Sequence, residues 1–200
     1  MSLFRKIFGS SHSAAEEQKE SEFSTYYTEP TISIDEQFIF NFKKNGGKFL
    51  YCENNVEVTE QFENILEEND WFESEVLCYD PELFKLLNDN KLTYDNVVNP
   101  RFLLSGCENL IAEEGSILFS SKQIKQQKPN DLPANMIILA KASQIIGTKS
   151  DGLSAIKKKY ERDYPTNIST IKYFEKAKEE DFTQYGSSAK NLYLLLLEDL

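Results

Sequence analysis

The sequence is poor in the residues from which most protein metal and redox centres are built. It contains one histidine, His12, and three cysteines, and no two cysteines have the close spacing of a metal-binding pair. A zinc or iron–sulfur site built by this chain alone is therefore not expected. A magnesium ion held by carboxylates stays open, but no motif indicates one, and we expect neither a metal nor a cofactor in this chain.

Long apolar runs and an excess of positive charge are also missing. No run of eighteen apolar residues occurs, and residues 1–8 lack both the apolar length and the cleavage site of a signal peptide. Acidic residues number 33 against 22 basic ones, so the formal net charge is −11. Because phosphate binding needs clustered Lys and Arg, this balance argues against nucleic acid as a partner. We expect a cytoplasmic protein without a transmembrane segment.

The common enzyme signatures are absent from the sequence as well. It has no Gly-x-Gly-x-x-Gly, no Walker loop, no Gly-x-Ser-x-Gly and no histidine placed to serve a nucleophile. Cys52, Cys78 and Cys107 lie far apart beside apolar residues, which favours reduced, buried and inert thiols. A mechanism based on carboxylates and the absence of catalysis both stay open.

The first 30 residues differ in composition from the rest of the chain. Residues 10–30 are rich in Ser, Glu, Thr and Lys and have few aliphatic side chains, so burial cannot offset the entropy of ordering. We therefore predict a flexible N-terminal arm over 1–30 and one α/β domain over 31–200. Residues 1–8 carry apolar side chains at helical spacing, which fits either a small docking helix or a frayed terminus.

From Ile32 onward, helix-like and strand-like segments alternate along the chain. The patterns predict helices over 35–44, 58–68, 81–88 and 152–162, a β-hairpin over 109–120, and strands over 48–52, 75–79, 101–105, 136–140, 167–171 and 192–197. In the last helix, Leu153, Ile156 and Tyr160 are expected to face inward. Helices that alternate with apolar strands indicate an α/β fold with a mostly parallel sheet covered by helices on both faces.

Two loops combine glycine with polar side chains, and loops after strands are where open parallel sheets bind ligands. In the first, Glu113 and Glu114 are candidate catalytic carboxylates that would act as nucleophile or base. Gly115 would allow close backbone approach to a ligand, and Ser116 would offer a hydroxyl group. A solvated hairpin turn is the alternative interpretation of this loop.

The second loop is Tyr185-Gly186-Ser187-Ser188, which precedes the last predicted strand. Backbone N–H groups of Gly186 and Ser187 are candidate ligand-binding groups, because successive N–H groups can form a nest for an anion. An ordinary loop is the alternative interpretation here.

Three segments of the C-terminal half carry a recognisable pattern: Ala-Glu-Glu-Gly-Ser at 112–116, Leu-Pro at 132–133 followed by an apolar strand, and Ala-Ser-Gln-Ile-Ile at 142–146. With this pattern the chain resembles the LUD (lactate-utilization) domain family, and within it the cluster-free branch typified by lactate-utilization protein C. In that family the first segment reads roughly Ala-Glu-Thr-Gly-Thr and forms a hairpin. The resemblance spans 34–200. At 169–173 and 185–188, the chain lacks the arginine and the histidine of the family's two last loops.

This resemblance implies a fold of the NagB/RpiA/CoA-transferase type. It further implies a non-redox accessory or regulatory subunit in the oxidation of L-lactate to pyruvate, not catalytic alone, that binds a small ligand or an iron–sulfur partner subunit. One alternative is an enzyme or binder similar to CoA transferases or folate cyclo-ligases, which would use Glu113 or Glu114 and take a small acid, CoA or a phosphate as ligand. The other alternative is a degenerate family member that serves as an interaction scaffold.

Overall fold

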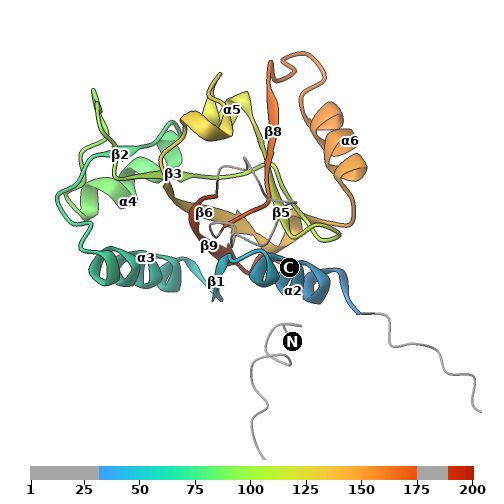
Figure 1. Ribbon diagram of the computed structural model, residues 1–200, viewed down its shortest axis with the longest axis horizontal. Helices are drawn as coiled ribbons and strands as arrows, with labels where there is room; N and C mark the ends of the chain where they lie inside the picture. Colours follow the sequence, from blue (N-terminus) through green and yellow to red (C-terminus); the bar gives the residue numbers. More distant parts are fainter. Residues whose placement is uncertain (1–31, 175–188) are drawn as a thin grey trace, which may run out of the picture. The chain divides into compact units, whose positions relative to one another are not determined.

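The computed structural model describes residues 32–174 and 189–200, which contain two β-sheets and the helices that cover them (Figure 1). The predicted N-terminal arm lies outside the described residues, and so do Gly186 and Ser187. The predictions made for those segments therefore stay predictions.

The larger sheet has five strands in the order β1-β9-β6-β3-β2, and every neighbouring pair is parallel. The strands are β1 (Lys48–Cys52), β2 (Val76–Leu77), β3 (Phe102–Ser105), β6 (Asn135–Lys141) and β9 (Asn191–Leu197). Leu194 and Leu195 of β9 are both fully buried although successive side chains point to opposite faces of a strand. Both faces of the sheet are therefore covered, which confirms the predicted α/β architecture.

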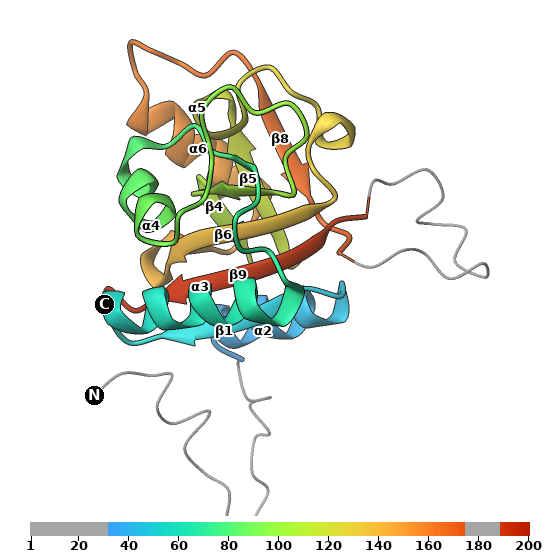
Figure 2. The ribbon, with the colours of Figure 1, turned by 90° about the vertical axis from the view of Figure 1, so that its left-hand side faces the viewer.

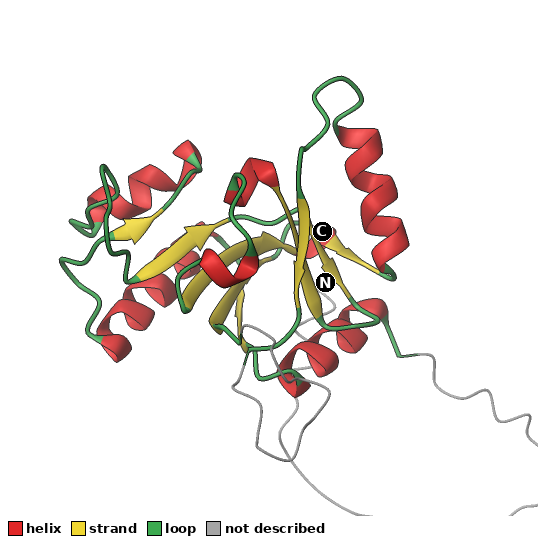
Figure 3. Ribbon diagram, turned by 45° about the horizontal axis from the view of Figure 1, so that its top comes forward, coloured by secondary structure: helices red, strands yellow, loops and turns green. Residues whose placement is uncertain are grey.

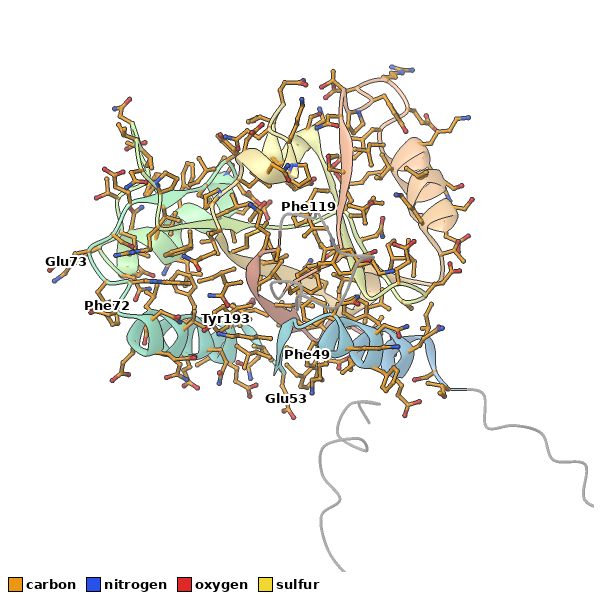
Figure 4. The ribbon with its side chains drawn as sticks, viewed as in Figure 1. Phe49, Glu53, Phe72, Glu73, Phe119 and Tyr193 are labelled. Atoms are coloured by element: carbon orange, nitrogen blue, oxygen red, sulfur yellow. The ribbon has the colours of Figure 1, made fainter. Side chains whose placement is uncertain are left out.

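Helices lie on both faces of this parallel sheet (Figures 1 and 2). One face carries α3 (Asn55–Asn69) and α4 (Phe84–Asp89), the latter preceded by the 3-10 turn η1 (Pro81–Leu83). The other face carries α2 (Ile34–Lys44). On the α3 side, Phe62 and Trp71 pack in one core cluster with Phe102 and Tyr193, and Figure 4 shows Tyr193 between β9 and α3.

Local signals set where the helices begin. Ser33 caps α2 through a reciprocal pair of hydrogen bonds with Glu36, in which each side chain accepts from the backbone N–H of the other residue. Asn54 caps α3, since its Oδ1 accepts from the N–H groups of Val56 and Glu57. α3 therefore begins at Asn55, three residues before the predicted start of that helix.

The predicted hairpin forms part of a second sheet of four strands, in the order β7-β4-β5-β8. Figure 3 draws the strands of both sheets in yellow. Its strands are β4 (Asn109–Ile111), β5 (Ser116–Ser120), β7 (Ile145–Ile146) and β8 (Ile168–Ile171). β4 and β5 pair antiparallel as predicted, β8 joins β5 antiparallel, and β7 joins β4 parallel. The short helix α5 (Ser121–Ile124) and the 3-10 turns η2 (Pro129–Asp131) and η3 (Ala142–Gln144) connect the two sheets.

Helix α6 (Lys149–Lys159) packs on the second sheet, and here one prediction is wrong. Ile156 is buried against Ile111 and Leu118, but Leu153, predicted to face inward, is 38% exposed. The position next to it, Gly152, faces the sheet, where an added Cβ would lie 2.8 Å from the Leu118 side chain. Gly152 is buried because it lets α6 approach the sheet closely, but it has no apolar side chain. A prediction from hydrophobic periodicity therefore places the adjacent Leu153 on the buried face instead.

Candidate functional site

The predicted site segment 113–116 forms the tight turn of the β4–β5 hairpin. Gly115 adopts φ +61°, and its N–H donates to the carbonyl oxygen of Ile111 at 2.8 Å. Ser116 is buried, and its hydroxyl donates to the Glu114 carboxylate at 3.1 Å. Glu113 is exposed. The structure thus brings the four predicted residues together, but it uses the Ser116 hydroxyl within the hairpin.

Two asparagines of α2 hold this turn from the helix side. Asn41 Nδ2 donates to the carbonyl oxygens of Ala112 (2.8 Å) and Glu113 (3.2 Å). Asn45 Nδ2 donates to the carbonyl oxygens of Glu114 (2.7 Å) and Gly115 (3.2 Å). The turn is therefore docked on α2, and none of its residues lines the pocket described next. The catalytic role of Glu113 and Glu114 stays a prediction.

A pocket of about 330 Å³ opens at the carboxyl edge of the parallel sheet, the edge toward which β9 points in Figure 2. Its polar lining comes from the start of α3, from η1 and from the segments that end or follow β3 and β6: Asn55, Asp80, Glu82, Cys107, Lys141 and Gln144. Open α/β sheets bind ligands at this edge, because the loops there converge while the strands stay rigid. We call this site the edge pocket.

Gly106 also lines the edge pocket and leaves room for a ligand to approach the backbone. An added Cβ would have the Leu139 carbonyl oxygen at 3.8 Å and Asp80 Oδ2 at 3.9 Å as its nearest atoms. Asp80 and Glu82 place two carboxylates in the lining against the single ammonium group of Lys141. The edge pocket therefore favours a neutral or cationic group over a free anion.

Gln144 connects the segments that follow β3 and β6. Its Nε2 donates to the carbonyl oxygens of Cys107 (2.8 Å) and Glu108 (3.1 Å), while its Oε1 accepts from the N–H of Lys141 at 2.7 Å. Both ends of the amide are used, so Gln144 positions the backbone of the edge pocket. From the sequence it stands out only as part of the LUD-like segment 142–146.

Glu108 follows the lining residue Cys107 in the chain and is not among the residues predicted from the sequence. Its side chain is 1% exposed, and its carboxylate accepts four hydrogen bonds. Oε1 accepts from Ser120 Oγ (2.6 Å), Gln123 Nε2 (2.9 Å) and Tyr160 Oη (3.0 Å), and Oε2 accepts from Lys159 Nζ (2.9 Å). The sequence offers one signal for this residue: Glu108 lies between two apolar strands. A carboxylate buried there requires a hydrogen-bond donor or a positive charge as its partner.

Burial by itself raises the pKa of Glu108, but the hydrogen bonds from Ser120, Lys159 and Gln123 outweigh burial and hold that pKa below its ordinary value. Glu108 is thus ionised, and its carboxylate already accepts four hydrogen bonds from protein donors. It joins the end of β3 to β5, α5 and α6, and it is not free to act as a base for a ligand in the edge pocket.

Cys107, the residue before Glu108, lines the edge pocket and is 5% exposed. Burial raises its pKa far above the ordinary value, and the neighbouring charge of Glu108 raises it further. Burial likewise raises the pKa of Cys52 and of Cys78 to about 11. Because the thiolate is the reactive form, these three groups are poor nucleophiles at neutral pH.

Over 32–174 and 189–200, no three His, Cys, Asp or Glu side chains gather as potential metal ligands. The helices within these two ranges are all too short or too polar to cross a membrane.

A comparison with solved structures shows which fold this is. A DUF162 family protein from Deinococcus radiodurans superimposes with a TM-score of 0.59, covering 83% of this chain and 96% of that protein, at 13% sequence identity. No protein-family model and no curated protein sequence matches this chain. DUF162 corresponds to the LUD-domain proteins. At this identity the likeness concerns the fold alone, so this chain has the α/β fold of a protein from the group that its C-terminal half resembles.

Proposed function

We propose that this chain is a LUD-type accessory or regulatory subunit that serves the oxidation of L-lactate to pyruvate without a redox centre of its own. The observation that carries the proposal is the likeness in fold to the DUF162 family protein. It agrees with the LUD-like residue pattern at 112–116 and 132–146. In this role the electrons would pass through iron–sulfur subunits on other chains.

The edge pocket supports a binding role better than a catalytic one. The Cys107 thiol is held in its protonated form, the Glu108 carboxylate has four donors, and the Gln144 amide is used at both ends. None of these three is therefore available as a nucleophile or general base. The carboxylates of Asp80 and Glu82 would receive a neutral or cationic group, either of a small ligand or of the iron–sulfur partner.

A genetic test addresses the proposal directly. Deletion of the gene in its host is expected to abolish growth on L-lactate as sole carbon source and to leave growth on pyruvate unchanged. The full chain should restore growth on L-lactate, whereas Gly106→Leu, which fills the edge pocket, should not. Normal growth of the deletion strain on L-lactate would contradict the proposal.

Two control variants separate the edge pocket from other causes. Ala155→Leu adds the same side chain on the exposed face of α6 and should restore growth. Glu113→Gln, in the exposed turn, should also restore growth; its failure, with an unchanged thermal midpoint, would favour the enzyme alternative that uses Glu113. Gly106→Ala, whose Cβ meets only ordinary contacts, should keep the wild-type thermal midpoint. The midpoint of Gly106→Leu is measured beside the growth test, so that a loss of growth through unfolding is recognised.

A further inference from the structure

Charge is divided unevenly along the described chain. Residues 32–120 carry 18 acidic side chains and 6 basic ones, whereas residues 121–174 carry 10 basic side chains and 4 acidic ones. The acidic range includes α2 and α3, and the basic range includes α5, α6 and β8. In both Figure 1 and Figure 2, α6 lies near the top and α3 near the bottom. A protein that is acidic as a whole therefore has a basic region around α6.

The side of α6 that faces away from the second sheet is built from two rows of residues spaced by four. Residues four apart are neighbours on a helix surface. The first row is Lys149, Leu153 and Lys157, the second is Ser150, Ser154 and Lys158, and every one of the six is exposed. Gly152 and Ile156 form the buried row. The outward rows thus hold three ammonium groups and no carboxylate.

The ion pairs of this region lie outside the two outward rows. Lys159, in the row of Ala155, pairs with the buried Glu108 at 2.9 Å. Lys122 of α5 pairs with Asp163. Within the described ranges 32–174 and 189–200, the three lysines of the outward rows make no ion pair. Their charges are therefore open to a partner.

Nearby carboxylates do not cancel the charge of this side. Asp151 is held at the helix start, because its Oδ2 accepts from the N–H (3.1 Å) and the hydroxyl (2.8 Å) of Thr148. Glu161 is exposed and lies close to Lys157, since both line one hollow. Arg162, also exposed, is a fourth cation that has no ion pair among the described residues. Even with both carboxylates counted in full, the four cations leave a positive excess.

Exposed apolar side chains lie next to Lys157. Leu153, one turn before it, is 38% exposed, and Tyr164 is 47% exposed. Tyr164, Lys157 and Glu161 line an open hollow of about 520 Å³. Protein interfaces combine an apolar anchor seated in a pocket with a rim of polar and charged groups. We call the two outward rows of α6, together with Arg162 and Tyr164, the basic face.

Helix stability accounts for only part of the basic face. Cations in the last turn of a helix interact favourably with the helix dipole, which suits Lys157 and Lys158. Lys149, however, is the first residue of α6, where the same dipole disfavours a cation, and Arg162 lies beyond the helix. Positive charge along the whole outward side therefore fits recognition of an acidic partner better than it fits capping.

We propose that the basic face docks a second protein, one whose surface presents carboxylates around an exposed apolar side chain. Its carboxylates would pair with the lysines of the outward rows and with Arg162, and its apolar side chain would enter the hollow beside Tyr164. At physiological salt, charges more than about 8 Å apart are largely screened. The local charge of the basic face therefore outweighs the formal net charge of −11.

The mixed character of the basic face favours a protein over other polyanions. Glu161, in the wall of the hollow, repels a uniformly anionic surface such as nucleic acid or a membrane, whereas a protein can place a donor opposite it. This docking face goes beyond the proposed function. It selects an acidic surface, which differs from the neutral or cationic group that the edge pocket favours.

The test begins with a photo-reactive residue, p-benzoyl-phenylalanine, placed at Ser154 of the full chain in living host cells. Irradiation is expected to attach one protein at this position, and mass spectrometry should map the attachment to an acidic segment of that protein. The same photo-reactive residue at Asn64, which is exposed on α3, is the matched control and should not trap that protein.

Binding of the purified pair, without the photo-reactive residue, then measures the role of the charges. Lys157→Glu combined with Lys158→Glu should weaken binding about tenfold or more, because close charge pairs across the interface become repulsive. Lys44→Glu combined with Lys91→Glu makes the same change in net charge at exposed lysines outside the basic face, and it should bind as the wild type does. Added salt should weaken wild-type binding.

A second variant separates docking from helix stability, since new carboxylates in the last turn of α6 oppose its dipole. Ser150→Glu combined with Ser154→Glu adds carboxylates to an outward row in the first half of the helix, and it should also weaken binding with an unchanged thermal midpoint. Ala155→Leu, in the row whose lysine is already paired, should bind as the wild type does.

Four results would overturn the assignment: no protein attached at Ser154, attachment of a second copy of this chain, attachment of nucleic acid or lipid instead of protein, or binding that both charge variants of α6 leave unchanged. The docking test does not depend on lactate. Its failure and failure of the growth test on L-lactate are therefore independent results.

Discussion

Replacement of Gly115 by alanine is expected to destabilise the fold by about 3 to 5 kcal/mol, the sum of a left-handed backbone cost and of overpacking. Gly115 has φ +61°, and an added Cβ would lie 2.3 Å from the backbone carbon of Asn41 and 2.4 Å from the backbone nitrogen of Phe42. Backbone atoms of a helix cannot rotate away as a side chain can. The hairpin turn and α2 would have to separate, and the four hydrogen bonds from Asn41 and Asn45 would be lost.

Equilibrium unfolding in urea, followed by circular dichroism, measures this effect. Gly147→Ala is the matched control, since an added Cβ there meets only Asp151 at 3.5 Å and Ile34 at 3.9 Å, and its cost should stay below about 1 kcal/mol. Glu113→Ala, exposed in the same turn, should change the free energy of unfolding by no more than about 0.5 kcal/mol. A Gly115→Ala protein as stable as the wild type would show that the hairpin is not docked on α2 as described.

Replacement of Glu108 by alanine should cost about 3 to 5 kcal/mol of unfolding free energy, because it removes the acceptor from a buried polar network. Ser120, Gln123 and Tyr160 would each lose a partner in a place that water reaches poorly. Lys159 differs, because its side chain is 56% exposed and can return to water. Lys159→Met leaves the Glu108 carboxylate buried with its three neutral donors but without its counter-ion, so it should cost about 2 kcal/mol, less than Glu108→Ala.

A double-mutant cycle with Glu108→Ala and Lys159→Met checks this division of the free energy. A coupling of about 2 kcal/mol is expected between the two, because Lys159 has no buried carboxylate to neutralise once Glu108 is replaced. If Lys159→Met alone destabilised the protein as much as Glu108→Ala, the ion pair, and not the neutral donors, would dominate the network.

Glu108 also predicts how stability depends on pH. Its pKa in the folded protein is lowered from the ordinary value of 4.5, so the folded state binds the proton less readily than the unfolded state does. The stability it contributes is fully present above about pH 4.5 and is lost as the pH falls through the folded pKa. The urea midpoint of the wild type should therefore fall more steeply below about pH 4.5 than that of Glu108→Gln. Parallel curves for the two proteins would exclude this contribution.

Most elements of the fold could be predicted from the sequence, because their signals are local. The strand predicted at 48–52 is β1, and the helix predicted at 35–44 differs from α2 by one residue. The pair Ser33 and Glu36 and the glycines at 46–47 bound α2 within a few residues of the chain. The hairpin around 109–120 was equally readable, since its strands and turn are contiguous.

The sequence did not predict which strands pair with one another in the second sheet. Strand 168–171 has the same apolar character as a strand of a parallel sheet, yet it pairs antiparallel with β5, about 50 residues earlier in the chain. Periodicity shows that a segment is a strand but does not select its neighbour. Periodicity also does not show that Gly152 packs against Leu118. For this reason it did not predict the exposure of Leu153.

By itself, the sequence determined the α/β class, the longer helices and strands and the buried cysteines, because burial and capping depend on the nature of each residue and its near neighbours. It did not indicate the short elements α5, η2, η3 and β7. Only the tertiary structure decided which polar groups meet. It docked the turn of Glu113 and Glu114 on α2 and gave Glu108 partners 12 to 52 residues away. Hydrogen bonds and charges act through space over a few ångströms, so a site assembled from distant segments leaves no periodic trace in the sequence.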